Sequence, residues 1–300
     1  MKIFSGSSNK PLAQKLADKL QISLSPLEIH IFADGERRVR ILDKVIDEDC
    51  VIVQSCSSPV DTNYMELFFI ADGLKRSGAK SVTAVIPYLG YQRQDHIFRD
   101  GEAVSLEVIV KTLEAVGINR VIVFDLHSVR IEQAFHIPLV HLSGLPLFAE
   151  TIKRIVPHGS ATILVSPDMG GIRRIKLLSG MLNNLSYAAI EKNRDLETGE
   201  VEMVGAQGLD NKYKTAIIVD DMISSGGTIA GASDFLKEKG IKEVFVFATH
   251  AIFSDDAPQI LSKNELIKKV YVTDAVYVPK EKQFEKLDIL SIAHLTAGNL

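Results

Sequence analysis

The stretch IIVDDMISSGGTIAG, residues 217–231, decides the fold because it joins three different local patterns. A short apolar run comes first and is typical of a buried strand. Two adjacent carboxylates, Asp220 and Asp221, follow at the end of that run. A loop of small and hydroxyl-bearing residues comes next, and a helix is expected to begin near Thr228. The segment therefore predicts a strand, a tight loop and a helix in direct succession.

The same alternation extends outward in both directions along the chain. Apolar strand candidates are CVIVQS (50–55), SVTAVIP (81–87), RVIVFDL (120–126), ATILVSP (161–167), TAIIVDD (215–221) and EVFVFATH (243–250). Segments with helical apolar spacing lie between them: 64–78, 104–117, 170–183 and 228–240. Alternation of helices with fully apolar strands predicts an α/β fold, in which helices cover both faces of a parallel sheet.

One pattern recurs in both halves, namely an apolar strand that ends abruptly in polar, Gly-rich residues. Ligands of open α/β sheets bind beyond the carboxyl ends of the strands, so each half is expected to be one such domain. The predicted boundary lies at Ser143, which gives domains 1–143 and 144–300. The polar stretch KNRDLETGEVEMVG (192–205) interrupts the apolar rhythm and is interpreted as a long exposed loop, a kind of segment that is often functional.

The loop after Asp221 has the composition of a phosphate cradle. Glycine allows close backbone approach and positive φ, and backbone N–H groups at a helix start attract anions. The two carboxylates are placed to accept hydrogen bonds from vicinal hydroxyls, so the combined site suits a phosphorylated sugar. A plain strand–helix turn with Asp near the N-cap explains neither the doubled Asp nor the hydroxyl-rich loop. The candidate residues are Asp220, Asp221, Ser224, Ser225, Gly226, Gly227 and Thr228.

This segment resembles the 5-phosphoribosyl 1-pyrophosphate motif of type I phosphoribosyltransferases and of ribose-phosphate pyrophosphokinases. Four further stretches favour the second family: FADGE (32–36), PYLGYQRQD (87–95), DLHS (125–128) and SPDMGG (166–171). The resemblance covers most of the chain. It implies two tandem type I phosphoribosyltransferase-like domains, each a mainly parallel sheet flanked by helices, with about the last 15 residues packing back on the N-terminal domain. The implied reaction moves the β,γ-pyrophosphoryl group of ATP to the C1 hydroxyl of ribose 5-phosphate.

The resemblance also assigns roles to individual residues. It implies that ATP is gripped by Phe32, Asp34, Gly35, Glu36, Arg93 and Gln94. It places His127 and Asp168 at a Mg²⁺ ion, and Asp168 is a suitable oxygen ligand. Lys192 and Arg194 match two basic catalytic residues, and Arg194 is also implied in binding ribose 5-phosphate together with the seven residues of the phosphate cradle. Taken without the family, His127 and Phe32 are more often structural residues, and charged stretches such as 192–205 are usually only solvated.

The composition of the chain bears on its expected partners and on its expected compartment in the cell. The net charge is −4, so no general basic field predicts binding to nucleic acid. The N-terminus MKIFSGSSNK lacks the apolar run of a signal peptide, and no apolar stretch has the length of a bilayer span. Cys50 and Cys56 have no partners at zinc spacing and are expected to be reduced thiols, as in a cytoplasmic protein. The family implies a homo-oligomer in which the ATP segment of one subunit completes the neighbour's site.

Three differences from the common family pattern, and two alternatives, remain at this point. Ser224 replaces the more frequent Asp, HIFRDGE (96–102) is less basic than in many bacterial members, and the chain ends at Leu300. Control by ADP and phosphate is therefore not implied. The alternatives are a phosphoribosyltransferase that uses the same sugar site with a base acceptor, and a catalytically silent regulatory homologue.

Overall fold

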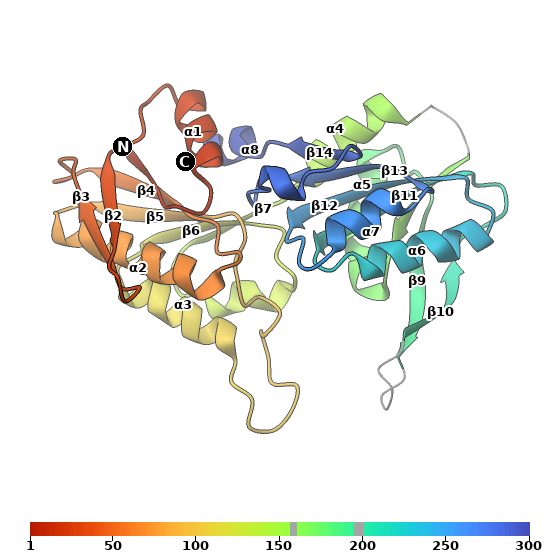
Figure 1. Cartoon of the computed structure of the whole chain (residues 1–300), viewed down its shortest axis with the longest axis horizontal. Coiled ribbons are helices and arrows are strands. Elements are labelled where there is room, and N and C mark those ends of the chain that lie inside the picture. The colour runs from red at the N-terminus through yellow and green to blue at the C-terminus, as the bar shows by residue number, and fades with distance from the viewer. Residues whose placement is uncertain (157–160, 195–200) are drawn as a thin grey trace. The chain divides into compact units, whose positions relative to one another are not determined.

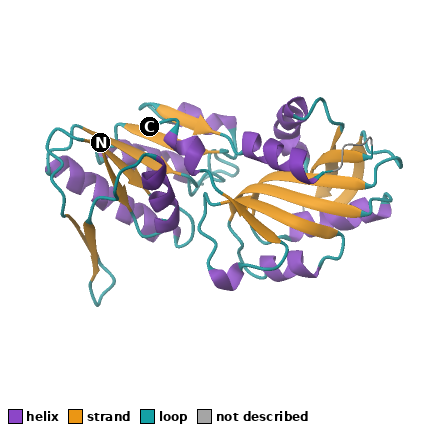
Figure 2. Ribbon diagram, turned by 90° about the horizontal axis from the view of Figure 1, so that it is seen from above, coloured by secondary structure: helices purple, strands orange, loops and turns teal. Residues whose placement is uncertain are grey.

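The computed structural model describes residues 1–156, 161–194 and 201–300. The chain divides into two compact units. Unit 1 comprises Met1–Ser143, Ala275–Tyr277 and Ser291–Leu300, and unit 2 comprises Gly144–Asp274 and Val278–Leu290. Figures 1 and 2 show both termini in unit 1.

The core of unit 1 is a five-stranded parallel sheet in the order β1-β4-β5-β6-β7. Its strands are β1 (Lys2–Ser5), β4 (Asp49–Val53), β5 (Ser81–Ile86), β6 (Arg120–Phe124) and β7 (Leu139–Leu142). The three central strands are almost entirely buried, as expected for a parallel sheet with both faces covered.

Helices lie on both faces of this sheet (Figure 1). Helices α2 (Val60–Arg76) and α3 (Ser105–Ala115) lie on one face, and α1 (Lys10–Lys19) and the short α8 (Ala293–Ala297) lie on the other. Successive side chains of a strand point to opposite faces, so alternate residues serve the two layers. Ile52, Ala84 and Val123 accordingly belong to the same core cluster as the apolar residues of α2 and α3.

Segments from the end of the chain complete unit 1. Helix α8 packs against α1, and Arg120 Nη2 donates to the carbonyl oxygen of Asn299 over 2.9 Å. The buried hydroxyl of Ser55 donates to the carbonyl oxygen of Ala275 over 2.7 Å. Strand β4 and its neighbours are thus held in part by residues more than 170 positions away in the sequence.

A separate antiparallel hairpin belongs to unit 1. It consists of β2 (Leu27–Ile31) and β3 (Arg37–Ile41), and Val39 and Ile41 pack against the core cluster of unit 1. A 3₁₀ helix, η1 (Val129–Ala134), follows β6.

The core of unit 2 is a seven-stranded sheet in the order β10-β9-β8-β11-β12-β13-β14. All neighbouring strands run parallel except β9 and β10, which pair antiparallel. The strands are β8 (Thr162–Ser166), β9 (Tyr187–Arg194), β10 (Val201–Gln207), β11 (Thr215–Ile223), β12 (Glu243–Ala251), β13 (Ile267–Thr273) and β14 (Leu287–Leu290).

Two helix layers cover this second sheet. Apolar residues of α4 (Leu145–Ile155) and α5 (Ile172–Met181) form one cluster with Ile217 and Val219 of β11. Residues of α6 (Gly227–Glu238) and α7 (Ala257–Lys263) form another with Ala216 and Ile218. The alternation along β11 therefore buries the strand on both sides. Two short 3₁₀ helices complete the unit, η2 (Met169–Gly171) and η3 (Lys280–Lys282).

The predicted α/β fold is confirmed, and every strand and helix proposed from the sequence overlaps an observed element. The interpretation of 192–205 as a long loop was wrong for its described part. Residues 192–194 continue β9, residues 201–205 belong to β10, and the two strands pair antiparallel with a register shift between Met203 and Gly205. A two-stranded ribbon needs no apolar face because its backbone groups satisfy each other, so polar composition did not reveal it. Within the described residues, no helix combines the length and the apolar character needed to cross a membrane.

Candidate active site

The carboxylate pair lies within β11 and beyond the end of the neighbouring β8. Pairing with β8 stops at Ile218, whereas pairing with β12 continues to Ile223. Asp220 and Asp221 therefore stand where one side of the strand has lost its neighbour, which is the edge where ligands of α/β sheets bind. The sequence placed them at the end of the strand, and the observed strand extends two residues farther.

Arg174, on α5, binds both carboxylates. Its Nη1 donates to Asp220 Oδ1 over 3.4 Å, and its Nη2 lies 3.7 Å from Asp221 Oδ1. All three side chains are at most 16% exposed. Burial raises the pKa of Asp220 well above its usual range, and the neighbouring Asp221 carboxylate raises it further, while Arg174 opposes the change. Burial and the neighbouring carboxylate therefore outweigh the single guanidinium in setting the pKa of Asp220.

Asp168 adds a third carboxylate near this pair. It caps η2 by accepting a hydrogen bond from Gly171 N over 3.2 Å, and its charge also raises the pKa of Asp220. A Cβ on Gly171 would lie 2.3 Å from Ser166 Oγ, so a larger residue there would displace this hydroxyl. The Ser166 hydroxyl is fully buried and has no hydrogen-bond partner among the described residues. This end of β8 thus retains unused hydrogen-bonding capacity.

The loop after β11 exposes an uncapped helix N-terminus. Gly226 is the N-cap of α6, and no side chain of the described residues caps the first turn of this 12-residue helix. Gly226 has φ +80°, a conformation that favours glycine. Ser225, Gly227 and Thr228 are exposed, whereas Ser224 is half-buried with its Oγ 3.1 Å from Ser254 Oγ. Free N–H groups and hydroxyls at a helix start attract anions, and the phosphate cradle expected from the sequence stays a prediction.

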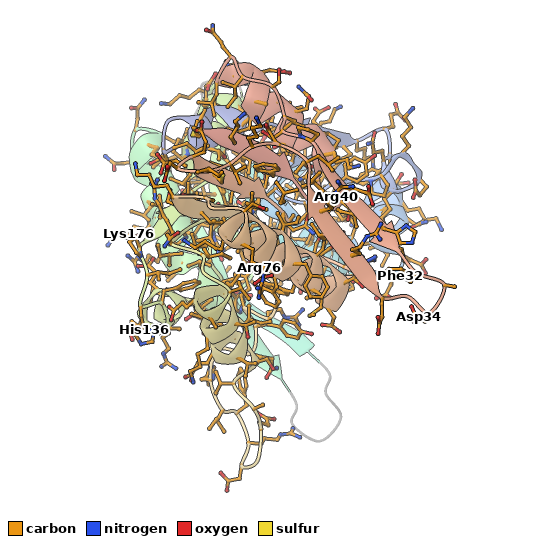
Figure 3. All side chains as sticks on the ribbon, turned by 90° about the vertical axis from the view of Figure 1, so that its left-hand side faces the viewer. Phe32, Asp34, Arg40, Arg76, His136 and Lys176 are labelled. Carbon is orange, nitrogen blue, oxygen red and sulfur yellow. The ribbon has the colours of Figure 1, made fainter. Side chains whose placement is uncertain are left out.

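The predicted ATP segment, Phe32–Glu36, forms the turn of the β2–β3 hairpin. Figure 3 shows Phe32 and Asp34 at the tip of the hairpin, with Arg40 farther back along β3. Phe32 is 42% exposed and is flanked by His30, edge to face, and by the Arg38 guanidinium at 5.9 Å from the ring centroid. Gly35 has φ +91°, and Asp34 Oδ1 accepts a hydrogen bond from Glu36 N. The turn is therefore built locally and presents an aromatic ring to its surroundings.

The predicted contacts Arg93 and Gln94 lie on the loop after β5 and are exposed. No hydrogen bond or ion pair joins them to the hairpin tip among the residues that the structure describes. A hydrogen bond links this loop to the one after β6, because Gln92 Oε1 accepts from His127 N over 3.0 Å. We call this bond the loop clasp. The clasp fixes the backbone of the exposed His127 relative to Arg93 and Gln94.

Lys192 and Arg194 lie at the end of β9, opposite Met203 and Val201 of β10. Their residue positions are two apart on one strand, so they share a face. Their side chains lie outside the described part of the structure. In the described ranges, no three His, Cys, Asp or Glu side chains are gathered as a ready-made metal cluster.

Comparison with known proteins assigns the family. The N-terminal domain of ribose phosphate pyrophosphokinase matches residues 1–117, and the phosphoribosyl synthetase-associated domain matches residues 191–300. The ribose-phosphate pyrophosphokinase of Fusobacterium nucleatum is 39% identical over 99% of this chain and 93% of its own, and ribose-phosphate pyrophosphokinase 1 of Lactococcus lactis is 40% identical over 99% and 91%. The chain belongs to the ribose-phosphate pyrophosphokinase family. The crystal structure of phosphoribosylpyrophosphate synthetase from Mycobacterium smegmatis has a TM-score of 0.91, with 34% identity and coverage of 99% of this chain and 96% of that one.

The structure of this ribose-phosphate pyrophosphokinase family member adds residues that the sequence interpretation missed. Arg174 is the counter-ion of the carboxylate pair, and Gln92 forms the loop clasp with His127 N. Two buried carboxylates side by side need a cation, and the arginines of GGIRRIKLL were a usable signal for it. Nothing in the sequence alone distinguishes Gln92 from any other loop glutamine.

Proposed function

We propose that the protein transfers the β,γ-pyrophosphoryl group of ATP to the C1 hydroxyl of ribose 5-phosphate and releases AMP and 5-phosphoribosyl 1-pyrophosphate. The observation that carries this proposal is the pairing of the buried Asp220–Asp221 carboxylates with the uncapped N-terminus of α6. In a chain of this family, that pairing supports a site for a sugar that carries both hydroxyls and a phosphate.

The 5-phosphate is assigned to the loop between β11 and α6. Its oxygens accept hydrogen bonds from backbone N–H groups at the helix start and from the hydroxyls of Ser225 and Thr228. The ribose hydroxyls donate to Asp220 and Asp221, whose orientation is held by Arg174. Binding therefore places C1 of the sugar at the edge of the sheet rather than over α6.

ATP is assigned to the hairpin turn and the loop after β5. Phe32 offers a flat apolar face for adenine, while Asp34 and Glu36 offer acceptors. Arg93 supplies a fork of donors that matches phosphate oxygens, and Gln94 and Gly35 complete the set. The hairpin tip has no polar link to Arg93 among the described residues. This supports a homo-oligomer in which the tip of one subunit serves the ATP of another.

A Mg²⁺ ion fits the donor chemistry of this chain. Asp168 would hold it as an oxygen ligand, and His127 would act through a bound water, since Mg²⁺ keeps several waters. When bound, the ion neutralises charge on the triphosphate. Asp168 lies within an acidic group whose negative charge Arg174 only partly offsets, and this favours a cation there.

Lys192 and Arg194 are assigned to the migrating pyrophosphoryl group. The C1 oxygen forms a bond to the β-phosphorus, the bond from that phosphorus to the α,β-bridging oxygen breaks, and the C1 hydroxyl loses its proton. Transfer of this kind depends on positioning and charge stabilisation. Two cations on one strand face suit the charge that develops on the departing oxygen.

The buried free thiols Cys50 and Cys56 support a reducing compartment, so we assign the protein to the cytoplasm.

The experiment that tests the function mixes the protein with ATP, Mg²⁺ and ribose 5-phosphate and follows the products by phosphorus NMR. AMP and a new pyrophosphorylated sugar are expected, and excess chelator should abolish both. A reaction that needs a base and 5-phosphoribosyl 1-pyrophosphate instead would indicate a phosphoribosyltransferase, and no turnover with intact binding would indicate a regulatory homologue.

A further inference from the structure

The β2–β3 hairpin carries a cation on its inner face. The strands pair Ile29 with Val39 and Ile31 with Arg37, and Val39 packs against the core of unit 1. Side chains on one strand alternate between faces, so Arg37 stands on the same inner face as Val39. An apolar residue would continue this face toward the tip, and the sequence places an arginine there instead.

This inner face lines a cavity of about 470 Å³, which we call the hairpin cavity. Ile29, Ile31 and Arg37 line it from the hairpin. Ser5 from the end of β1 and Lys10 from the first position of α1 also line it. The cavity thus combines an apolar surface, to which Ile31 contributes a 57% exposed side chain, with two positive charges.

Within the part of the chain that the structure describes, the two cations of the hairpin cavity have no counter-ion. Glu66 is the acidic residue of the lining, but its oxygens accept from the Ser7 backbone and hydroxyl and from Gln54 Nε2. Among the described residues, neither Arg37 nor Lys10 forms an ion pair. Nη1 of Arg37 is shielded from water and has no hydrogen-bond partner in the described ranges of the chain. A buried donor without a partner is unfavourable, so the guanidinium gains by turning toward an anion in the cavity.

The position of Lys10 in the first turn of α1 also favours a bound anion. A positive side chain in the first turn of a helix lies at the positive end of the helix dipole, which is unfavourable without a nearby anion. The hydroxyls of Ser5 and Ser25 donate to Gly6 O and to Asp43 Oδ2, so they offer only lone pairs to a ligand. The cavity therefore offers cationic donors from Arg37 and Lys10. It also offers hydrogen-bond acceptors from the two serines and an apolar surface from the isoleucines of the hairpin.

We propose that the hairpin cavity binds a small organic phosphate monoester whose ester group is apolar or flat. The guanidinium of Arg37 offers paired donors that match two phosphate oxygens, and Lys10 supplies a second charge. The apolar body lies against Ile29 and Ile31. None of the cavity residues belongs to the ATP or ribose 5-phosphate sets assigned above, so this site goes beyond the proposed function.

The test is calorimetric titration of the whole protein with phenyl phosphate. The buffer contains a chelator with saturating ribose 5-phosphate and AMP, so that the substrate sites are occupied and no turnover occurs. Phenyl phosphate should bind, and inorganic phosphate should bind at least about tenfold more weakly because it lacks the apolar body. Arg37→Gln and Lys10→Gln should each raise the Kd for phenyl phosphate at least about tenfold.

The matched control is Arg40→Gln, which removes the same charge from the same strand. Arg40 is exposed on the opposite face of β3, so the Kd of this variant for phenyl phosphate should stay within about twofold of wild type. Absence of binding to the wild-type protein would overturn the proposal. Equal weakening by Arg40→Gln and the cavity variants would also overturn it, since binding would then follow overall charge. If Arg37→Gln fails to fold, Lys10→Gln decides alone, because Lys10 is an exposed helix residue.

Discussion

Gln92 Oε1 accepts a hydrogen bond from the backbone N–H of His127 over 3.0 Å, although the two residues are 35 positions apart. Gln92 is only 1% exposed, and its Nε2 has no partner among the described residues. The bond therefore contributes through the acceptor end of the side chain. It couples the loop assigned to ATP with the loop assigned to the metal.

Gln92→Met should keep the volume of the side chain and remove its acceptor. His127 N is then left without this bond, so the free energy of unfolding should fall by about 1–3 kcal/mol. We expect kcat to fall about tenfold with smaller changes in both KM values, because the loop loses alignment rather than a substrate contact. Steady-state kinetics beside a denaturant titration measure both effects. Gln14→Met, on the exposed face of α1, is the control; an equal loss of kcat in both variants would contradict a role of the clasp.

Asp220→Asn should stabilise the free protein at neutral pH. Burial, next to the Asp221 carboxylate, raises the pKa of Asp220 in the folded state above its unfolded value of 3.8. A raised pKa means that the favourable contribution of the protonated form is present below pH 3.8 and is lost as the pH rises. The melting temperature of Asp220→Asn should therefore exceed that of wild type by a margin that grows from pH 4 to pH 8.

Activity should move in the opposite direction in that variant, because a charged acceptor for the ribose is removed. Asp234→Asn, an exposed carboxylate on α6, is the matched control and should leave both the pH profile and kcat unchanged. A gap in melting temperature that narrows as the pH rises would show that Asp220 is stabilised as a carboxylate by Arg174, contrary to the expectation.

Gly226→Ala and Gly227→Ala should separate folding from binding. Gly226 has φ +80°, and a Cβ there would lie 3.3 Å from Ala257 Cα, so alanine should cost about 1–3 kcal/mol of stability. A Cβ on Gly227 meets nothing closer than Ser225 Oγ at 3.8 Å, so stability should change by less than about 0.5 kcal/mol. That Cβ projects at the exposed helix start, and the KM for ribose 5-phosphate should rise about tenfold. Thermal melts measure the stability of the two variants, and substrate titrations measure their KM for ribose 5-phosphate. An unchanged KM in Gly227→Ala would contradict the assignment of the 5-phosphate to this loop.

Lys192→Ala should lower kcat by at least about 10²-fold, because a cation aimed at a transferring phosphoryl group acts mainly on the transition state. Both KM values should change by less than about tenfold, since ground-state binding does not depend on that contact. Lys268→Ala, an exposed lysine of β13, is the control and should match wild type. A large rise in KM with constant kcat would assign Lys192 to substrate binding, and no change in either would leave it as a solvated residue.

The strands and helices that the sequence predicted are those with strong apolar periodicity, such as β11 and α2. The missed elements lack that signal for a physical reason. Strand β3 (RRVRI) carries charge at alternate positions because its outer face is exposed, and its inner face is apolar only in part. The described parts of β9 and β10 depend on a partner strand whose position no local pattern specifies.

The site follows the same division. The positions of Asp220, Gly226 and Gly227 at a strand end and a helix start were predictable from local patterns, and their roles toward a sugar phosphate stay predictions. Arg174 was missed because its role depends on where α5 lies relative to β11, which is a tertiary property. The roles of Phe32, His127 and Lys192 came from resemblance and stay predictions.

The interleaving of the two units bears on the order in which they mature during synthesis. The chain passes between units after Ser143, Asp274, Tyr277 and Leu290, and unit 1 includes the last residues, which pack on α1 and bond to Arg120. Unit 2 has received all its residues once Leu290 has left the ribosome, whereas unit 1 must wait for Leu300 although its sheet was made first. At roughly 5–20 residues per second, the early sheet stays unfinished for about 8–30 s. During that interval the surface of α1 that α8 later contacts is without this partner helix.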